Sequence, residues 1–209
     1  MNSKVTHINV GNLAENCWFL ANEDTKEAVV IDPGAEPDRI CAAAEKHGWK
    51  ITAILLTHGH IDHMGACESL RTELGVKVYA LTEEEDLLLD AKKNLSVFIE
   101  RKVVTFEPDE LLRDGQELTL AGMKIQVIHT PGPTPGGCSY YVAEAGCVFS
   151  GDTLFAESVG RSDFPGGSTS ALVRAVKEKL FLLPDDTLVC PGHGEETTIG
   201  HEKKYNPFV

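Results

Sequence analysis

Short apolar segments separated by turns make up the first third of the chain. Residues 5–10, 17–21 and 28–31 are such segments, and the third ends at Asp32-Pro33-Gly34, a composition typical of a turn. We therefore expect three strands of a meander. Residues 37–48 repeat apolar positions at helical spacing between a proline and a glycine, which predicts a helix.

The middle of the chain alternates strand and helix patterns. A strand is expected at 51–56, a helix at 64–74 and a further strand at 76–80. Thr82-Glu83-Glu84-Glu85 has the pattern of a capping box and predicts the start of a short acidic helix. Residues 92–116 follow neither period, so we assign no element there; such a segment is typical of a lid or a substrate-facing loop.

The last part of the chain predicts two hairpins, a helix and a strand. Residues 117–128 and 139–149 each hold two strand patterns around a turn, residues 171–181 are amphipathic, and residues 187–190 are a last strand pattern. Each half thus runs strands first and then helix. We predict an α/β fold: an αββα sandwich of two mixed β-sheets with helices on both outer faces, which buries the strands on both sides.

Composition narrows the class of protein. With 209 residues, 42% of them hydrophobic, the chain can bury one large core, and we expect a single domain over residues 1–209. The net charge of −13 repels polyanions, so nucleic acid and anionic membranes are not expected partners. The first ten residues lack the features of a secretory signal, and six widely spaced cysteines without a CxxC pair indicate reduced thiols. We expect a cytoplasmic protein, and the sequence leaves its oligomeric state open.

The segment 57–63 carries most of the candidate chemistry. His58, His60, Asp62 and His63 lie directly after an apolar strand pattern. His58 and His60 are two apart and project to one side of an extended backbone, whereas Asp62 and His63 at a helix start point elsewhere. One pair can hold one metal ion and the other pair a second, an arrangement that suits hydrolysis by a metal-bound hydroxide.

Further ligands are expected after other strand patterns, because a catalytic zinc site has three or four protein ligands and an open position. Asp152 and His193 each follow such a pattern, and a carboxylate such as Asp152 can bridge two cations. Zinc is the expected metal, as one or two ions, with iron and manganese as alternatives. Three other histidines belong to no cluster and are interpreted as surface or hydrogen-bonded residues: His7, His47 and His201.

Motifs that share one known pattern extend over nearly the whole chain. They are VIDPG at 30–34, LLTHGHIDH at 55–63, TPGPTPG at 130–136, SGD at 150–152, GRSDFPG at 160–166, PGHG at 191–194 and NPF at 206–208. With them the sequence resembles the metallo-β-lactamase superfamily, and within it the short glyoxalase II-like hydrolases. The resemblance implies the αββα fold and one metal held by His58 and His60. It also implies a second metal held by Asp62, His63 and His193, with Asp152 shared between the two.

One position departs from the family pattern. Where glyoxalase II-like proteins read TPGHTPG, with that histidine completing the first metal's ligands, this chain has Pro133, whose side chain offers no ligand atom. The first metal would be held by His58, His60 and Asp152 alone, so we expect weaker occupancy there. His129 could in principle substitute, but we interpret it as a strand-end residue hydrogen-bonded locally, because a proline stiffens the intervening backbone.

The resemblance implies hydrolysis of a small-molecule thioester, such as an S-acylglutathione or a related thiol adduct; the residues alone indicate only a hydrolase. Asp62 would orient or deprotonate the nucleophile. We expect this protein to lack the helical extension with which two-domain glyoxalase II binds glutathione, so the thiol carrier stays open. One alternative is a mononuclear iron persulfide dioxygenase, ranked lower because the resemblance requires a histidine at Pro133. Another is a metal-binding relative that has lost turnover. For Arg161-Ser162-Asp163 we keep two interpretations, a substrate contact and a structural salt bridge.

Overall fold

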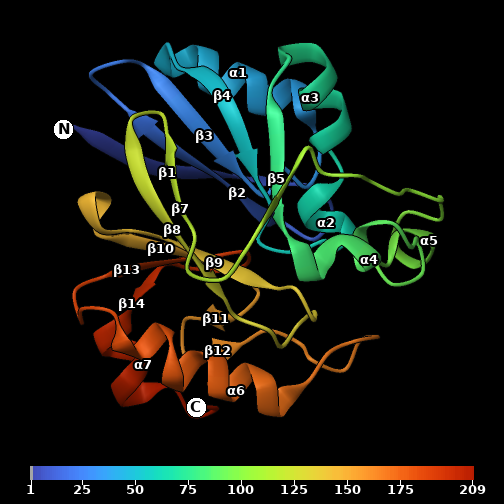
Figure 1. Ribbon diagram of the computed structural model, residues 1–209. Coiled ribbons are helices and arrows are strands. Elements are labelled where there is room, and N and C mark those ends of the chain that lie inside the picture. The colour runs from blue at the N-terminus through green and yellow to red at the C-terminus, as the bar shows by residue number, and fades with distance from the viewer. Residues whose placement is uncertain (1) are drawn as a thin grey trace.

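Apolar side chains on both faces of the central strands produce a layered fold. In β2 (Glu15–Asn22), β3 (Glu27–Ile31) and β4 (Lys50–Leu55), alternate residues belong to two different hydrophobic cores. Strands without a polar face require cover on both sides. The computed structural model, which describes residues 2–209, shows two packed sheets with helices on both outer faces (Figure 1). The predicted αββα sandwich of two mixed sheets is confirmed.

The first sheet has the strand order β1-β2-β3-β4-β5-β6. β1 to β3 are antiparallel neighbours, whereas β3 to β6 are parallel. Helices α1 and α3 pack on its outer face. The elements not yet delimited are β1 (Ser3–Val10), β5 (Lys77–Leu81), β6 (Glu110–Leu112), α1 (Pro37–His47) and α3 (Cys67–Leu74).

The second sheet has the order β14-β13-β10-β9-β8-β7, in which β10 and β13 form a parallel pair. Helices from the last third of the chain cover its outer face (Figure 1). Its strands are β7 (Glu117–Leu120), β8 (Met123–His129), β9 (Cys138–Val142), β10 (Cys147–Gly151), β13 (Leu188–Pro191) and β14 (Thr197–Thr198). The covering elements are α6 (Thr169–Glu178), the 3-10 helix η3 (Leu180–Leu182) and α7 (Ile199–Tyr205), and β11 (Leu154–Phe155) and β12 (Ser158–Val159) form a separate small ribbon.

The helix expected at 64–74 is two helices, α2 (Ile61–Met64) and α3, with a break at Gly65. A Cβ atom at Gly65 would lie 2.3 Å from the carbonyl oxygen of Gly34, so the chain there packs directly against the turn that follows β3. The predicted helix is confirmed over residues 67–74, but its start at residue 64 was wrong, because the contact between Gly65 and Gly34 forms only in the tertiary structure.

The predicted capping box at 82–85 is also wrong. The segment forms a 3-10 turn, η1 (Thr82–Glu84), followed by α4 (Glu85–Leu88), and neither has a side-chain cap. The Glu84 carboxylate instead accepts hydrogen bonds from Gly59 and Gly136 on other loops. Residues 92–116, to which no element was assigned, contain α5 (Ser96–Ile99) and β6.

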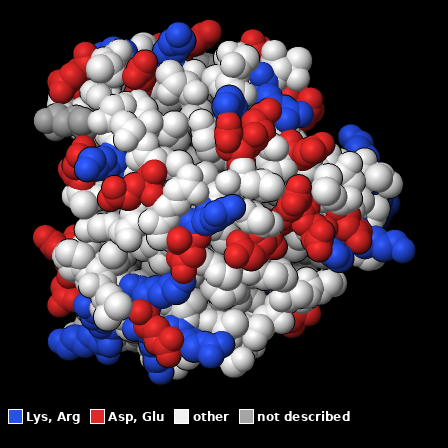
Figure 2. All heavy atoms as spheres, viewed as in Figure 1, with Lys and Arg blue, Asp and Glu red and all other residues white. Residues whose placement is uncertain are grey.

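The cysteines agree with the prediction of reduced thiols, and the surface carries charges of both signs. All six cysteines are free thiols. On the face shown in Figure 2, lysine and arginine side chains are interspersed with acidic ones and gather in no broad positive patch. Within residues 2–209, no helix combines the length and the apolar character needed to cross a membrane.

Candidate metal centre

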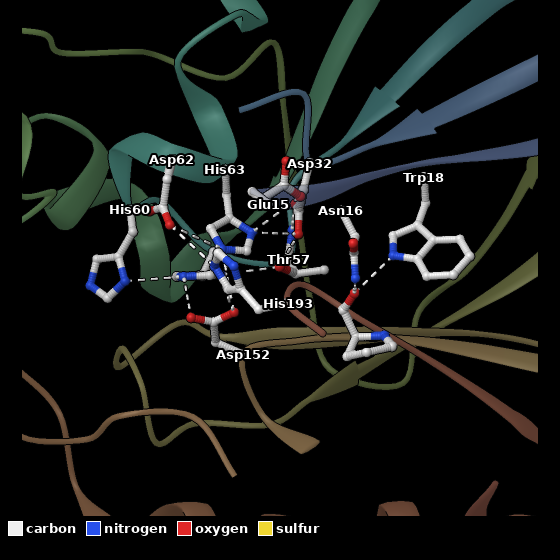
Figure 3. A network of polar contacts seen from close by, with 12 residues as sticks. Glu15, Asn16, Trp18, Asp32, Thr57, His60, Asp62, His63, Asp152 and His193 are labelled. Atoms are coloured by element: carbon white, nitrogen blue, oxygen red, sulfur yellow. Dashed lines mark hydrogen bonds and ion pairs between the residues drawn. The ribbon is translucent and has the colours of Figure 1, made fainter. Parts of the chain in front are cut away.

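The candidate ligands lie at the carboxyl ends of parallel strands in both sheets. β4 ends just before the loop with His58 and His60, and β10 and β13 end just before or within the turns that carry Asp152 and His193. Strands that run parallel end at the same edge of a sheet, and here the edges of both sheets meet. The structure therefore brings together all six residues predicted from sequence: His58, His60, Asp62, His63, Asp152 and His193. Figure 3 labels all of them except His58.

These residues form two groups whose ligand atoms lie within 4.8 Å of one another: His58, His60 and Asp152, and Asp62, His63 and His193. The carboxylate of Asp152 faces both groups. Its Oδ1 lies 3.3 Å from His63 Nε2 and 3.8 Å from His193 Nε2, and its Oδ2 lies 3.9 Å from His58 Nε2. The carboxylate of Asp152 is thus placed to be shared by two cations.

The donor atoms fit divalent cations. His63 Nε2 and Asp152 Oδ1 are buried, and within residues 2–209 neither has a hydrogen-bond partner. A buried polar atom without a partner costs about 1–3 kcal/mol, which a bound cation would offset. The separation of 3.1 Å between His58 Nε2 and His60 Nδ1 suits two ligands of one ion bound at about 2.0–2.1 Å. Imidazole and carboxylate donors suit zinc, iron and manganese.

Burial and mutual charge set the protonation of these groups. Burial, together with the neighbouring positive charge of His63, lowers the pKa of His58 well below its usual range, and burial lowers the pKa of His60 to about 4. Both are therefore neutral ligands at pH 7. Burial alone would also lower the pKa of His63, but the charges of Asp152 and Asp62 raise it well above its usual value. Burial opposes ionisation of Asp62, yet the charge of His63 lowers its pKa to about 2.

Asp32 orients His63, a role that the sequence analysis missed. It lies at the end of β3, is 2% exposed, and accepts bonds from the backbone N–H (2.7 Å) and hydroxyl (2.5 Å) of Thr57. Its Oδ2 also lies 3.0 Å from His63 Nδ1, so His63 donates there and points Nε2 at the candidate centre. The available signal is a carboxylate directly after an apolar strand pattern, within the VIDPG motif at 30–34.

Side chains at the start of β2 donate hydrogen bonds to the turn that carries His193, a role that the sequence did not predict. Asn16 Nδ2 donates to the carbonyl oxygens of Pro191 and Gly194, both at 3.0 Å, and Trp18 Nε1 donates to Pro191 at 2.9 Å (Figure 3). Both donor side chains are 1% exposed. The position of His193 therefore depends on a strand near the opposite end of the chain.

The Glu84 carboxylate bridges two loops beside the group of His58, His60 and Asp152. Its carboxylate accepts one bond from the Gly59 N–H and one from the Gly136 N–H, each at 2.8 Å. Gly59 separates His58 from His60, and Gly136 ends the loop that contains Pro133. Burial raises the pKa of Glu84 to about 7, although the two N–H bonds act in the opposite direction.

The departure from the family pattern lies beside the first group. Pro133 lines a small hollow together with His58 and Asp152. His129 Nε2 lies 2.8 Å from the carbonyl oxygen of Pro135, and His129 joins none of the candidate groups in the described chain. Its interpretation as a locally bonded strand-end residue is confirmed. Also outside these groups, in the part of the chain described, are His7, His47 and His201.

A pocket of about 290 Å³ adjoins the candidate centre. His60, Asp62, Asp152 and His193 line one side of it. A small molecule in this pocket would reach both groups.

Comparison with known proteins gives one family. The profile of the Metallo-beta-lactamase superfamily matches residues 10–193. The chain is 39% identical over 201 residues to the probable metallo-hydrolase YqgX of Bacillus subtilis, covering 96% of this chain and 94% of that protein. It is 36% identical over 197 residues to the hydroxyacylglutathione hydrolase GloC of Haemophilus influenzae, covering 93% and 92%.

Solved structures agree. The BLEG-1 B3 metallo-beta-lactamase superposes with a TM-score of 0.93 at 38% identity, covering 98% of this chain and 99% of that one. TTHA1623 in a di-iron-bound form gives 0.87 at 38% identity, covering 98% and 100%. ETHE1 from Myxococcus xanthus gives 0.78 at 30% identity, covering 99% and 84%.

Proposed function

The chain belongs to the metallo-beta-lactamase superfamily, and we propose that this metal-dependent hydrolase cleaves thioesters, such as an S-acylglutathione or a related thiol adduct. The observation that carries the proposal is the carboxylate of Asp152, shared between two donor groups that line one pocket. A relative named as a hydroxyacylglutathione hydrolase supports the choice of a thioester. The proposal includes zinc as the bound metal and the cytoplasm as the location, because a reducing compartment keeps the six thiols free.

The reaction needs few groups from the chain. Bound cations would polarise the thioester carbonyl and lower the pKa of a water molecule. Asp62 is ionised, lies 3.3 Å from His193 and lines the pocket, so its carboxylate can orient that water and accept its proton. The new C–O bond replaces the C–S bond, and the thiolate leaves without needing an acid.

A thioesterase assay tests this proposal. Protein loaded with zinc should hydrolyse S-D-lactoylglutathione, a chelator should abolish turnover, and added zinc should restore it. Asp62→Asn should lower kcat at least about 100-fold, as expected for a proton acceptor. The matched control, Asp186→Asn, alters an exposed carboxylate in the turn before β13 that does not line the pocket and should be near neutral. Turnover that survives the chelator, or an equal effect of both variants, would reject the mechanism.

An iron persulfide dioxygenase is the second candidate, because a specific feature favours it. The first group consists of two imidazoles and one carboxylate, the donor set of many iron(II) oxygenases. The similar structure of TTHA1623, which is in a di-iron-bound form, agrees with an iron site. One iron per chain in elemental analysis, together with oxygen uptake that depends on glutathione persulfide, would identify the activity as that of a dioxygenase and not of a thioesterase. Full metal content without either reaction would indicate a relative that has lost turnover.

A further inference from the structure

The pocket beside the candidate metal centre has an apolar wall next to the candidate ligands. Besides the four ligand residues and Arg161, five apolar side chains line it: Leu13, Leu95, Ile99, Phe155 and Phe164. Leu13 lies in the turn before β2, Leu95 directly precedes α5, and Ile99 ends α5. Phe155 lies in β11, and Phe164 lies in the loop after β12. Leu13 and Ile99 stay 49% and 40% exposed, so this wall is open to a ligand.

The pocket offers no free positive charge from the described residues that line it. The Arg161 guanidinium donates to both carboxylate oxygens of Asp163, at 3.0 and 2.8 Å, and lies 4.2 Å over the Phe164 ring. The whole chain carries a net charge of −13. An anionic part of a substrate is therefore not attracted to this wall, whereas an uncharged part can be buried there.

We propose that this wall binds the acyl group of the thioester as an apolar chain, and that the charged thiol carrier remains at the solvent-exposed mouth. The inference rests on the proposed function and names the substrate class within it. A volume of about 290 Å³ lies at the small end of ligand pockets and suits an acyl chain of a few carbons. Burial of each further methylene strengthens binding by up to about fourfold.

Binding of the product carboxylates tests the wall without any turnover. Acetate and hexanoate should be titrated into zinc-loaded protein by calorimetry at one salt concentration. We expect hexanoate to bind at least about tenfold more tightly than acetate, because its four additional methylenes are partly buried. Hexanoate that binds no more tightly than acetate would overturn the inference.

Two variants from different segments locate the effect. Ile99→Ser and Leu13→Ser change half-exposed side chains of the wall, so the fold should survive, and each should weaken hexanoate binding at least about threefold while leaving acetate unchanged. Val103→Ser is the matched control, because Val103 lies near Ile99, is 78% exposed and does not line the pocket. An equal loss in the control, or no loss in either wall variant, would contradict the assignment.

Turnover assays distinguish a failure of this inference from a failure of the proposed thioesterase function. With acetyl, butyryl and hexanoyl thioesters of one thiol, kcat/KM should rise with chain length at least about tenfold over the series. If no thioester is cleaved but hexanoate still binds preferentially, the proposed function fails and the apolar wall stands. If thioesters are cleaved at equal rates, or a lactoyl thioester is preferred over a butyryl one, the wall does not hold the acyl group and the thioesterase stands.

Discussion

Replacing Glu84 by glutamine should change how the stability of the metal-free protein depends on pH. Glu84 is 1% exposed, and burial raises its pKa to about 7 even though Gly59 and Gly136 donate hydrogen bonds to it. In the unfolded chain the same group titrates near 4.5. The folded state therefore retains a proton that the unfolded state has already released over this range of pH.

The sign follows from that difference. Below pH 4.5 the carboxyl group of Glu84 is protonated in both states, so its contribution to stability is fully present. As the pH rises from 4.5 to 7, the unfolded chain loses the proton more readily, and the free energy of unfolding falls. The difference between 4.5 and about 7, at about 1.4 kcal/mol for each pKa unit, corresponds to a loss of about 3 kcal/mol.

Urea denaturation of chelator-treated protein between pH 4.5 and 8 measures this loss. The free energy of unfolding of the natural protein minus that of Glu84→Gln should fall by about 3 kcal/mol over this range. A constant offset is also expected, because the amide can accept only one of the two N–H bonds, but only the slope tests the reasoning. Glu83→Gln, on the exposed side of the same turn, should give a flat difference. A flat difference for Glu84→Gln would refute the account.

Three further predictions concern the metal centre. Pro133→His should raise both the zinc content per chain and the thioesterase rate, because it adds an imidazole beside His58. Elemental analysis and the thioesterase assay measure these two quantities, and no change in either would contradict our account of position 133. Zinc binding should release about one proton at pH 7, because the pKa of His63 is raised well above its usual value and its Nε2 must lose a proton before it can bind the metal. The affinity for zinc should therefore increase with pH. Calorimetry in buffers of different ionisation enthalpy measures the number of protons released. Asn16→Ala removes one buried and one part-buried hydrogen bond to the His193 turn, so it should lower the free energy of unfolding by about 2–3 kcal/mol and weaken zinc binding. Urea denaturation and zinc titration measure both effects, and a neutral result would show that the turn keeps its position without Asn16.

Much of the fold could be predicted from the sequence because its determinants are local. The apolar runs at 17–21 and 28–31 lie within β2 and β3, and the proline and glycine around residues 37–48 mark the ends of α1. β6 could not be predicted in this way. It has three residues and exists because Glu110 to Leu112 pair with β5, a partner that no short window of sequence contains.

The sequence by itself determined the set of candidate metal ligands, because three histidines and an aspartate follow one strand and strand-end motifs supply Asp152 and His193. Only the tertiary structure decided how these side chains are held. The bonds from Thr57 to Asp32, from Gly136 to Glu84 and from Asn16 to Pro191 span 25, 52 and 175 residues. Ligand identity is a local property of the chain, whereas the orientation of a ligand depends on buried polar partners that become neighbours only after the two sheets pack.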